Sequence, residues 1–92
     1  HEAEEINKLY GFQNEVIEKY DLKMFGKFQE VFNWLPVAHC VNDSVLVMHG
    51  GLFCSDDVTL DDIRAIKRGC QPPRSGIMCD LLWSDPQVTF EK

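Results

Sequence analysis

The sequence predicts an α/β (α+β) fold in which N-terminal helices precede a β-hairpin and further short helices follow. Apolar residues recur every three or four positions through the first third of the chain. The pattern then changes to short runs rich in β-branched residues on either side of a two-residue turn. Helix-start and turn signals return after that point and predict the short helices.

Three helical segments are expected before the hairpin. Ala3, Ile6 and Tyr10 share one face, and Gly11 then interrupts the pattern. A second apolar stripe consists of Phe12, Val16, Ile17 and Tyr20. The clearest amphipathic pattern consists of Met24, Phe25, Phe28, Val31, Phe32 and Leu35. We expect Pro36 to end that helix because proline lacks the backbone N–H that a helix needs.

The hairpin is expected from 37–41 and 44–49, with Asn42-Asp43 as its turn. Valines occupy one face of the second strand, and Leu46 and Met48 occupy the other. A strand with two apolar faces is typical of the inside of a layered fold. One hairpin in 92 residues leaves little sequence to cover both faces. The chain also begins His1-Glu2-Ala3 without an initiator methionine, and we expect it to be a piece of a larger protein.

After the hairpin, Thr59 resembles the N-cap of a helix that continues to about Arg68. A turn-rich connector at 71–76 precedes a short apolar element at 78–83. The acidic residues around Thr59 could suggest a metal site: Asp56, Asp57, Asp61 and Asp62. Helix capping is the preferred interpretation, because carboxylates stabilise the first turn and the glycine spacing of an EF-hand loop is absent.

Composition argues against two classes of partner. Nine basic and fifteen acidic residues give a formal charge of −6, whereas nucleic acids and anionic membranes favour cationic surfaces. No apolar run approaches the roughly 18–20 residues of a membrane span. The sequence therefore predicts neither a nucleic-acid partner nor a membrane partner.

The four cysteines form no Cys-x-x-Cys pair, which disfavours a zinc ribbon or a thioredoxin-like site. We expect four reduced thiols, with Cys40 and Cys79 packed as small hydrophobic residues, and a cytoplasmic or nuclear location. Secreted chains could pair four cysteines in three ways, but no other feature suggests secretion.

Among the histidines, His39 is expected to be structural. His49 ends a predicted buried strand and is followed at once by Gly50-Gly51. Side chains at strand ends face ligand crevices in layered folds, and glycines let a backbone approach a metal or phosphate closely. The alternative for His49 is a core imidazole beside a tight turn.

Five segments then point in order to one family. They are His1-Glu2, Tyr10-Gly11-Phe12, Phe32-Asn33-Trp34-Leu35-Pro36, Met48-His49-Gly50-Gly51-Leu52 and Cys79-Asp80-Leu81-Leu82-Trp83-Ser84-Asp85-Pro86. This pattern resembles the metal-dependent serine/threonine phosphoprotein phosphatases, and Phe53, 58–64 and 71–73 resemble their type-5 branch. The resemblance implies that residues 1–92 are the central part of a catalytic domain with a four-layer α/β/β/α metallophosphatase sandwich.

The resemblance also implies roles for single residues. His1 matches a general acid, and His49 matches a metal ligand. Ile6, Tyr10 and Trp83 match a hydrophobic groove that takes substrates and inhibitors. Each groove residue has a structural alternative, since Ile6 and Tyr10 belong to a helical stripe and Trp83 could be ordinary core.

The implied cofactors are two divalent metal ions, of manganese, iron or zinc, in the intact domain. Most of the family's metal ligands have no match in this chain, so the chain alone is expected to be inactive. The implied substrates are phosphoserine and phosphothreonine proteins. The type-5 branch also implies a chaperone partner, bound through a helical-repeat domain that this sequence does not encode.

Two other functions stay open. One is a non-catalytic interaction module or pseudophosphatase that keeps the same scaffold. The other is a different metallophosphoesterase, such as a dinucleotide polyphosphate hydrolase, which the 81–86 segment disfavours because it resembles the protein phosphatases.

Overall fold

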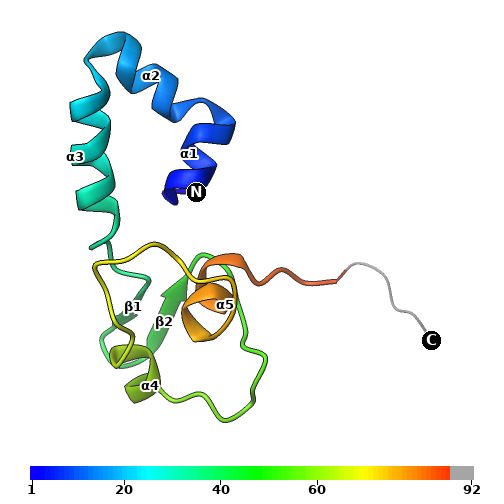
Figure 1. Ribbon diagram of the computed structural model, residues 1–92. Coiled ribbons are helices and arrows are strands. Elements are labelled where there is room, and N and C mark those ends of the chain that lie inside the picture. Colours follow the sequence, from blue (N-terminus) through cyan, green and yellow to red (C-terminus); the bar gives the residue numbers. More distant parts are fainter. Residues whose placement is uncertain (88–92) are drawn as a thin grey trace. The chain divides into compact units, whose positions relative to one another are not determined.

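The computed structural model describes residues 1–87, which form two compact units (Figure 1). The first unit contains residues 1–35 and 67–72, and the second contains residues 36–66 and 73–87. Helices and one antiparallel two-stranded sheet are present, so the expected mixed α/β class is confirmed. No helix within 1–87 is long and apolar enough to span a membrane.

Three helices build the first unit: α1 (Glu4–Tyr10), α2 (Phe12–Lys19) and α3 (Leu22–Phe32). Gly11 separates α1 from α2 with φ of 98°, a left-handed conformation that glycine adopts without steric cost. The Asp21 carboxylate accepts a hydrogen bond of 2.7 Å from the Met24 backbone N–H and so caps α3. The chain bends after α1, and α3 then folds back alongside (Figure 1).

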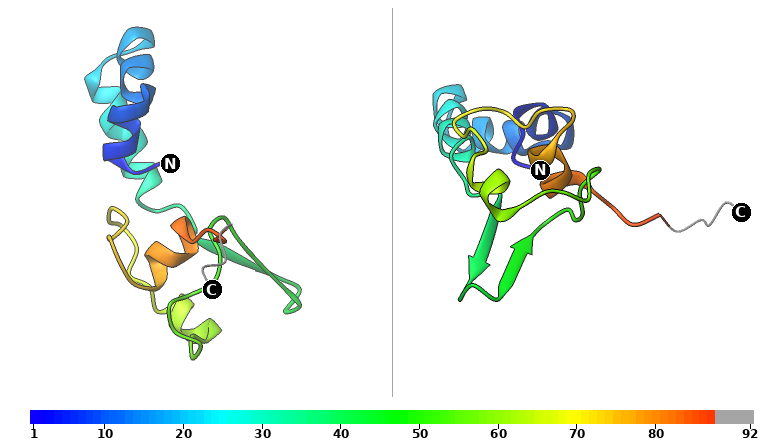
Figure 2. Two further views of the ribbon diagram at one scale, coloured as in Figure 1. Left: turned by 90° about the vertical axis from the view of Figure 1, so that its right-hand side faces the viewer. Right: turned by 90° about the horizontal axis from the view of Figure 1, so that it is seen from below.

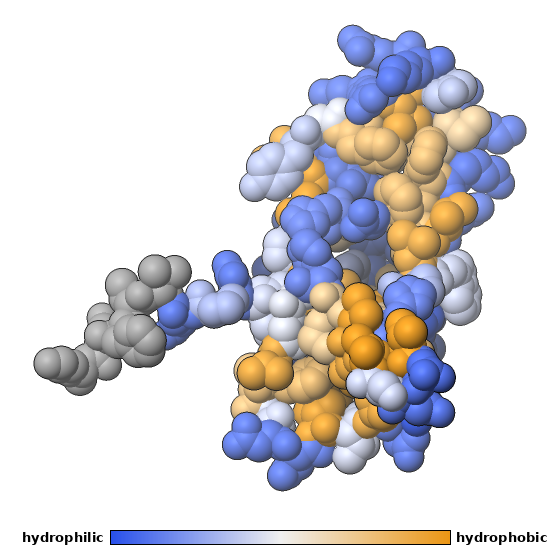
Figure 3. Space-filling model, turned by 180° about the vertical axis from the view of Figure 1, so that it is seen from behind, coloured by the Kyte–Doolittle hydropathy of each residue, from blue (hydrophilic) through white to orange (hydrophobic). Residues whose placement is uncertain are grey.

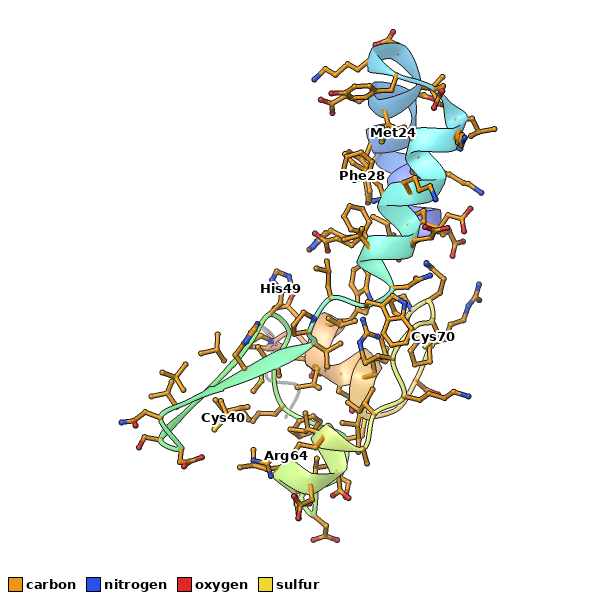
Figure 4. All side chains as sticks on the ribbon, turned by 90° about the vertical axis from the view of Figure 1, so that its left-hand side faces the viewer. Met24, Phe28, Cys40, His49, Arg64 and Cys70 are labelled. Atoms are coloured by element: carbon orange, nitrogen blue, oxygen red, sulfur yellow. The ribbon has the colours of Figure 1, made fainter. Side chains whose placement is uncertain are left out.

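Aromatic rings hold α2 against α3. The rings of Phe12 and Phe28 meet edge to face at 5.3 Å between centroids, and Phe32 lies within 6 Å of both. Phe28 points from α3 toward this cluster (Figure 4). Val16 and Phe25 are buried beside it. The apolar stripes predicted for these two helices therefore form their shared core.

The third helix ends earlier than expected. It stops at Phe32, and Trp34 and Leu35 continue with tighter bonds in which their N–H groups donate to the carbonyls three residues before them. The residue before a proline disfavours helical backbone angles, so Pro36 affects Leu35 as well as its own position.

The second unit contains the hairpin, β1 (Ala38–Val41) and β2 (Val45–Met48). Ala38 pairs with Met48, and Val41 pairs with Val45. Asn42 and Asp43 form the predicted turn with φ of 53° and 50°, values that asparagine and aspartate tolerate best among non-glycine residues. Both strands are slightly shorter than the sequence predicted.

Within the described residues the apolar faces of the hairpin are uncovered, as the shortage of covering sequence predicted. Val45, Leu46 and Val47 are 54%, 37% and 48% exposed, and the turn extends away from α4 and α5 (Figure 2). Cys40 is also exposed and not packed as expected, while Cys79 is half-buried. All four cysteines are free thiols. No other layer within residues 1–87 covers the hairpin, so its apolar side chains stay at the surface (Figure 3).

Two short helices complete the second unit, α4 (Leu60–Arg64) and α5 (Ile77–Trp83). Thr59 caps α4 as predicted, with a reciprocal bond to Asp62, although the helix ends four residues before Arg68. The apolar element predicted at 78–83 is α5. Its Met78 and Leu81 side chains are the buried core of this unit.

Candidate functional site

A tight turn after β2 positions His49. The next residue, Gly50, donates its backbone N–H to the Leu81 carbonyl at 2.7 Å, and Gly51 donates to the Asp80 carbonyl at 3.4 Å. These carbonyls belong to the last turns of α5. The Asp80 carbonyl also accepts the Ser84 N–H at 3.1 Å, and the Leu81 carbonyl is among the last four of the helix, which lack partners within it. His49 itself is exposed at the end of β2 that lies opposite the hairpin turn (Figure 4).

Gly50 has no room for a side chain. An added Cβ would lie 2.6 Å from the Asp80 carbonyl oxygen and 2.8 Å from both the Leu81 oxygen and the Trp83 nitrogen. All three are backbone atoms, so none can rotate away. The glycine is therefore needed here for close approach between the turn and the helix.

Side chains strengthen the same attachment. The Asp80 carboxylate accepts hydrogen bonds from the Cys54 backbone N–H at 3.0 Å and from the Cys54 thiol at 3.8 Å. The Ser84 hydroxyl donates to the Leu52 carbonyl at 2.7 Å. In the sequence, Asp80 and Ser84 are visible only as members of the 79–86 motif, and nothing there predicts that they anchor the loop. Their value as anchors depends on a contact between segments about 30 residues apart.

A cleft of about 560 Å³ lies where this loop faces the end of α5. Its lining residues are Gly50, Gly51, Leu52, Phe53, Cys54, Ser84, Asp85 and Pro86. Trp83 ends α5 and is 45% exposed, which makes it a surface residue and not core. The structure thus brings the His49 turn and the Trp83 end of α5 together within the second unit.

The other three predicted site residues belong to the first unit. His1 precedes α1, and its carbonyl accepts a hydrogen bond of 2.7 Å from the side-chain amide of Asn7. Ile6 and Tyr10 are four residues apart on α1 and so share one face. Ile6 is half-buried, whereas Tyr10 is 79% exposed and takes no part in the core.

Within residues 1–87 no group of three or more histidine, cysteine, aspartate or glutamate side chains could hold a metal ion. An imidazole nitrogen such as that of His49 suits a transition metal as a single ligand. It fits a metal site only as one member of a larger set. The acidic residues near Thr59 act as caps and ion-pair partners: Asp62 bonds Thr59, and Asp61 bonds Arg64 at 2.9 Å.

Comparisons with known proteins give a consistent result. A family profile described as Calcineurin-like phosphoesterase matches residues 1–91. The chain is 62% identical over 87 residues to serine/threonine-protein phosphatase 5 of Homo sapiens and 56% identical to that of Arabidopsis thaliana. It also resembles the solved structure of a protein serine/threonine phosphatase from Saccharomyces cerevisiae with similarity to human phosphatase PP5, at a TM-score of 0.91 and 45% identity.

The match covers nearly all of this chain but a small part of each relative. It includes 95% of the chain but only 17% of the human and 16% of the Arabidopsis protein. For the yeast structure it includes 97% of the chain and 28% of the solved chain.

Proposed function

Because the chain belongs to the calcineurin-like phosphoesterase family, we propose that it is part of the catalytic domain of a protein serine/threonine phosphatase. The supporting observation is the His49 turn, which is anchored to the end of α5 in a chain 62% identical to a named phosphatase of this kind. The proposed reaction is hydrolysis of phosphoserine and phosphothreonine in proteins. The remaining metal ligands would come from sequence outside this chain.

His49 would contribute one ligand to a metal centre. Divalent metal ions, when bound, act as Lewis acids that activate water and neutralise charge on a phosphoryl group. The chain's own contribution is to hold the imidazole in place: Gly50 and Gly51 bond the carbonyls of α5, and the Asp80 carboxylate holds the loop three residues further on. A ligand fixed in this way loses less conformational freedom on binding.

His1 would act as the general acid. A serine or threonine alkoxide leaves poorly unless it is protonated as the P–O bond breaks. An imidazole with an ordinary pKa near 6.5 can hold and deliver that proton at neutral pH. Ile6, Tyr10 and Trp83 would line an apolar groove for the peptide beside the phosphorylated residue, a role that suits exposed aromatic side chains.

Phosphorylated proteins are the proposed substrates. A chaperone partner would need a further domain, and the cytoplasmic or nuclear location proposed from the cysteine pattern can be checked by fractionation. The proposed ions are manganese, iron or zinc; iron and zinc suit an imidazole ligand and manganese prefers oxygen ligands, so metal analysis of the complete protein would identify them.

Two exposed histidines, His49 after β2 and His39 in β1, offer a matched pair of variants to test this function. In the complete protein, we expect His49→Ala to lower both manganese affinity and phosphate release from a phosphoserine peptide by at least about 100-fold. His39→Ala changes an exposed histidine on the neighbouring strand and should leave both values within about twofold.

The alternatives give different results. A complete protein that binds manganese and peptides but releases no phosphate would support the pseudophosphatase. Activity confined to dinucleotide polyphosphates would support the other metallophosphoesterase class. Either result would overturn the proposed function.

A further inference from the structure

We propose that Asn7 and Gln29 are positioning residues for His1. Their side chains form a buried relay that runs from α3 through α1 to the His1 backbone. This inference rests on the proposed function, since it assigns a task to residues around the proposed general acid. The sequence does not reveal the pair, because the two residues lie 22 positions apart on different helices.

The relay consists of two short hydrogen bonds. The Gln29 side-chain nitrogen Nε2 donates to the Asn7 oxygen Oδ1 at 2.6 Å, and the Asn7 nitrogen Nδ2 donates to the His1 carbonyl at 2.7 Å. Asn7 is 6% exposed and Gln29 is 8% exposed, which makes them the buried polar residues of the described chain. The Gln29–Asn7 bond is buried, and a bond shielded from water is stronger than the same bond at the surface, whereas the Asn7–His1 bond is partly buried.

Hydrogen-bond chemistry fixes the direction of the relay. The His1 carbonyl can only accept, so Asn7 must turn its Nδ2 toward it. The Asn7 oxygen Oδ1 then faces α3. Because this oxygen can only accept, Gln29 must turn its Nε2 donor toward it. The consequence is that Gln29 Oε1 faces the interior without a hydrogen-bond partner among residues 1–87.

This arrangement is expensive for stability alone. A buried oxygen without a hydrogen-bond partner is unfavourable, and apolar side chains of similar shape would fill both positions without that cost. A buried polar pair that carries this cost fits a need for a defined geometry. The group at the end of the relay is the backbone of His1.

Holding the His1 carbonyl limits rotation of the backbone that carries the imidazole. Catalysis depends on such placement, because an error of about 1 Å in a reacting group can cost a factor of about 100 in rate. Loss of the relay should therefore weaken proton donation more than it weakens substrate binding. The effect should appear in kcat, with KM little changed.

The choice of leaving group separates positioning from general damage. An alkoxide from a phosphoserine peptide needs the proton, whereas the aryl oxide from p-nitrophenyl phosphate leaves readily without it. In the complete protein, we expect the double variant Asn7→Leu/Gln29→Met to lower kcat at least about 10-fold on the peptide and less than about threefold on the aryl phosphate. Its melting temperature should stay near that of the wild type, because both partners become apolar together.

Three comparisons make the outcome decisive. Asn14→Ala changes an exposed asparagine on α2 and should leave both rates unchanged. Asn7→Ala should reproduce the selective loss of the double variant, and so should His1→Asn, which removes the acid itself. Equal losses on both substrates, or no loss on the peptide, would overturn the positioning role while leaving the proposed function intact. A wild-type protein inactive on both substrates would instead overturn the proposed function, and the inference with it.

Discussion

At Gly50, an added methyl group would force the His49 turn away from the end of α5. We expect Gly50→Ala to lower the free energy of unfolding of the second unit by about 3 kcal/mol or more, because the Cβ would lie within 2.8 Å of three backbone atoms. Hydrogen exchange of the Gly50 and Gly51 amides in the complete protein would measure the loss of their bonds to α5.

Gly26 provides the matched control. It lies inside α3 with nothing within 4 Å of an added Cβ. Alanine is the better helix former, so Gly26→Ala should stabilise the protein by about 0.5–1 kcal/mol. Equal effects at the two glycines would contradict the close approach at Gly50.

Single residues differ in how far the sequence reveals their roles. The position of His49 after an apolar run and before two glycines is visible in the sequence, and so is the turn at Asn42-Asp43. Asn7 and Gln29 are not, because their bond joins helices 22 residues apart and depends on how those helices pack. A polar residue at a stripe position is the one available signal: Gln29 follows the buried Phe25 by four residues.

At the scale of elements, the cap of α4 should respond to acid. Two hydrogen bonds from Thr59 lower the pKa of Asp62 below its ordinary value of 3.8. The larger effect comes from the Thr59 backbone N–H and the smaller from its hydroxyl. A carboxyl whose pKa is lower in the folded state stabilises the helix above the unfolded value, and this contribution is lost as pH falls through the folded pKa. We expect the Thr59 amide chemical shift to titrate with Asp62, and Asp62→Asn to abolish that titration.

An exposed loop carboxylate serves as the control for this titration. Asp56→Asn should leave the Thr59 amide response unchanged, because Asp56 lies outside the capping box. A Thr59 amide that shows no acid titration in the wild type would contradict the cap.

Gln71 should control the start of α1. Its side-chain oxygen accepts from the Glu4 backbone N–H at 2.8 Å, and its nitrogen donates to Asn33 Oδ1 at 2.8 Å. Ala3 supplies no side-chain cap, so Gln71→Ala leaves that N–H without its bond. A loss of about 1 kcal/mol would speed hydrogen exchange of the Glu4 amide about fivefold. Gln13→Ala should not change this rate.

Element types were predictable where periodicity was clear, but element ends were not. The apolar stripes located α1, α2 and α3, and β-branched runs located the hairpin. The end of α3 depended on the effect of Pro36 on the residue before it. The capping box of α4 marked its beginning, but no sequence signal marked its early end at Arg64.

For the whole molecule, the exposed hairpin matches what an incomplete set of layers would leave. Val41, Val45 and Val47 all lie at the surface, and so do Leu9 and Leu52 from other segments. Apolar residues on both faces of the second strand predict a covering layer, and the need for that layer stays a prediction. This pattern could not indicate whether this chain supplies that layer. The same reasoning applies to the site, for which the sequence offered one metal ligand and the described residues contain no set of three.

The chain alone should therefore bind metal weakly and show no metal-dependent activity. One imidazole has too few donor atoms to hold two divalent ions, so titration of the 92-residue chain with manganese should give the same weak binding as its His49→Ala variant. Phosphate release from a phosphoserine peptide should stay at the level of buffer. Tight, stoichiometric binding that His49→Ala abolishes would mean that this chain assembles a metal site unaided, and the expected dependence on outside ligands would be wrong.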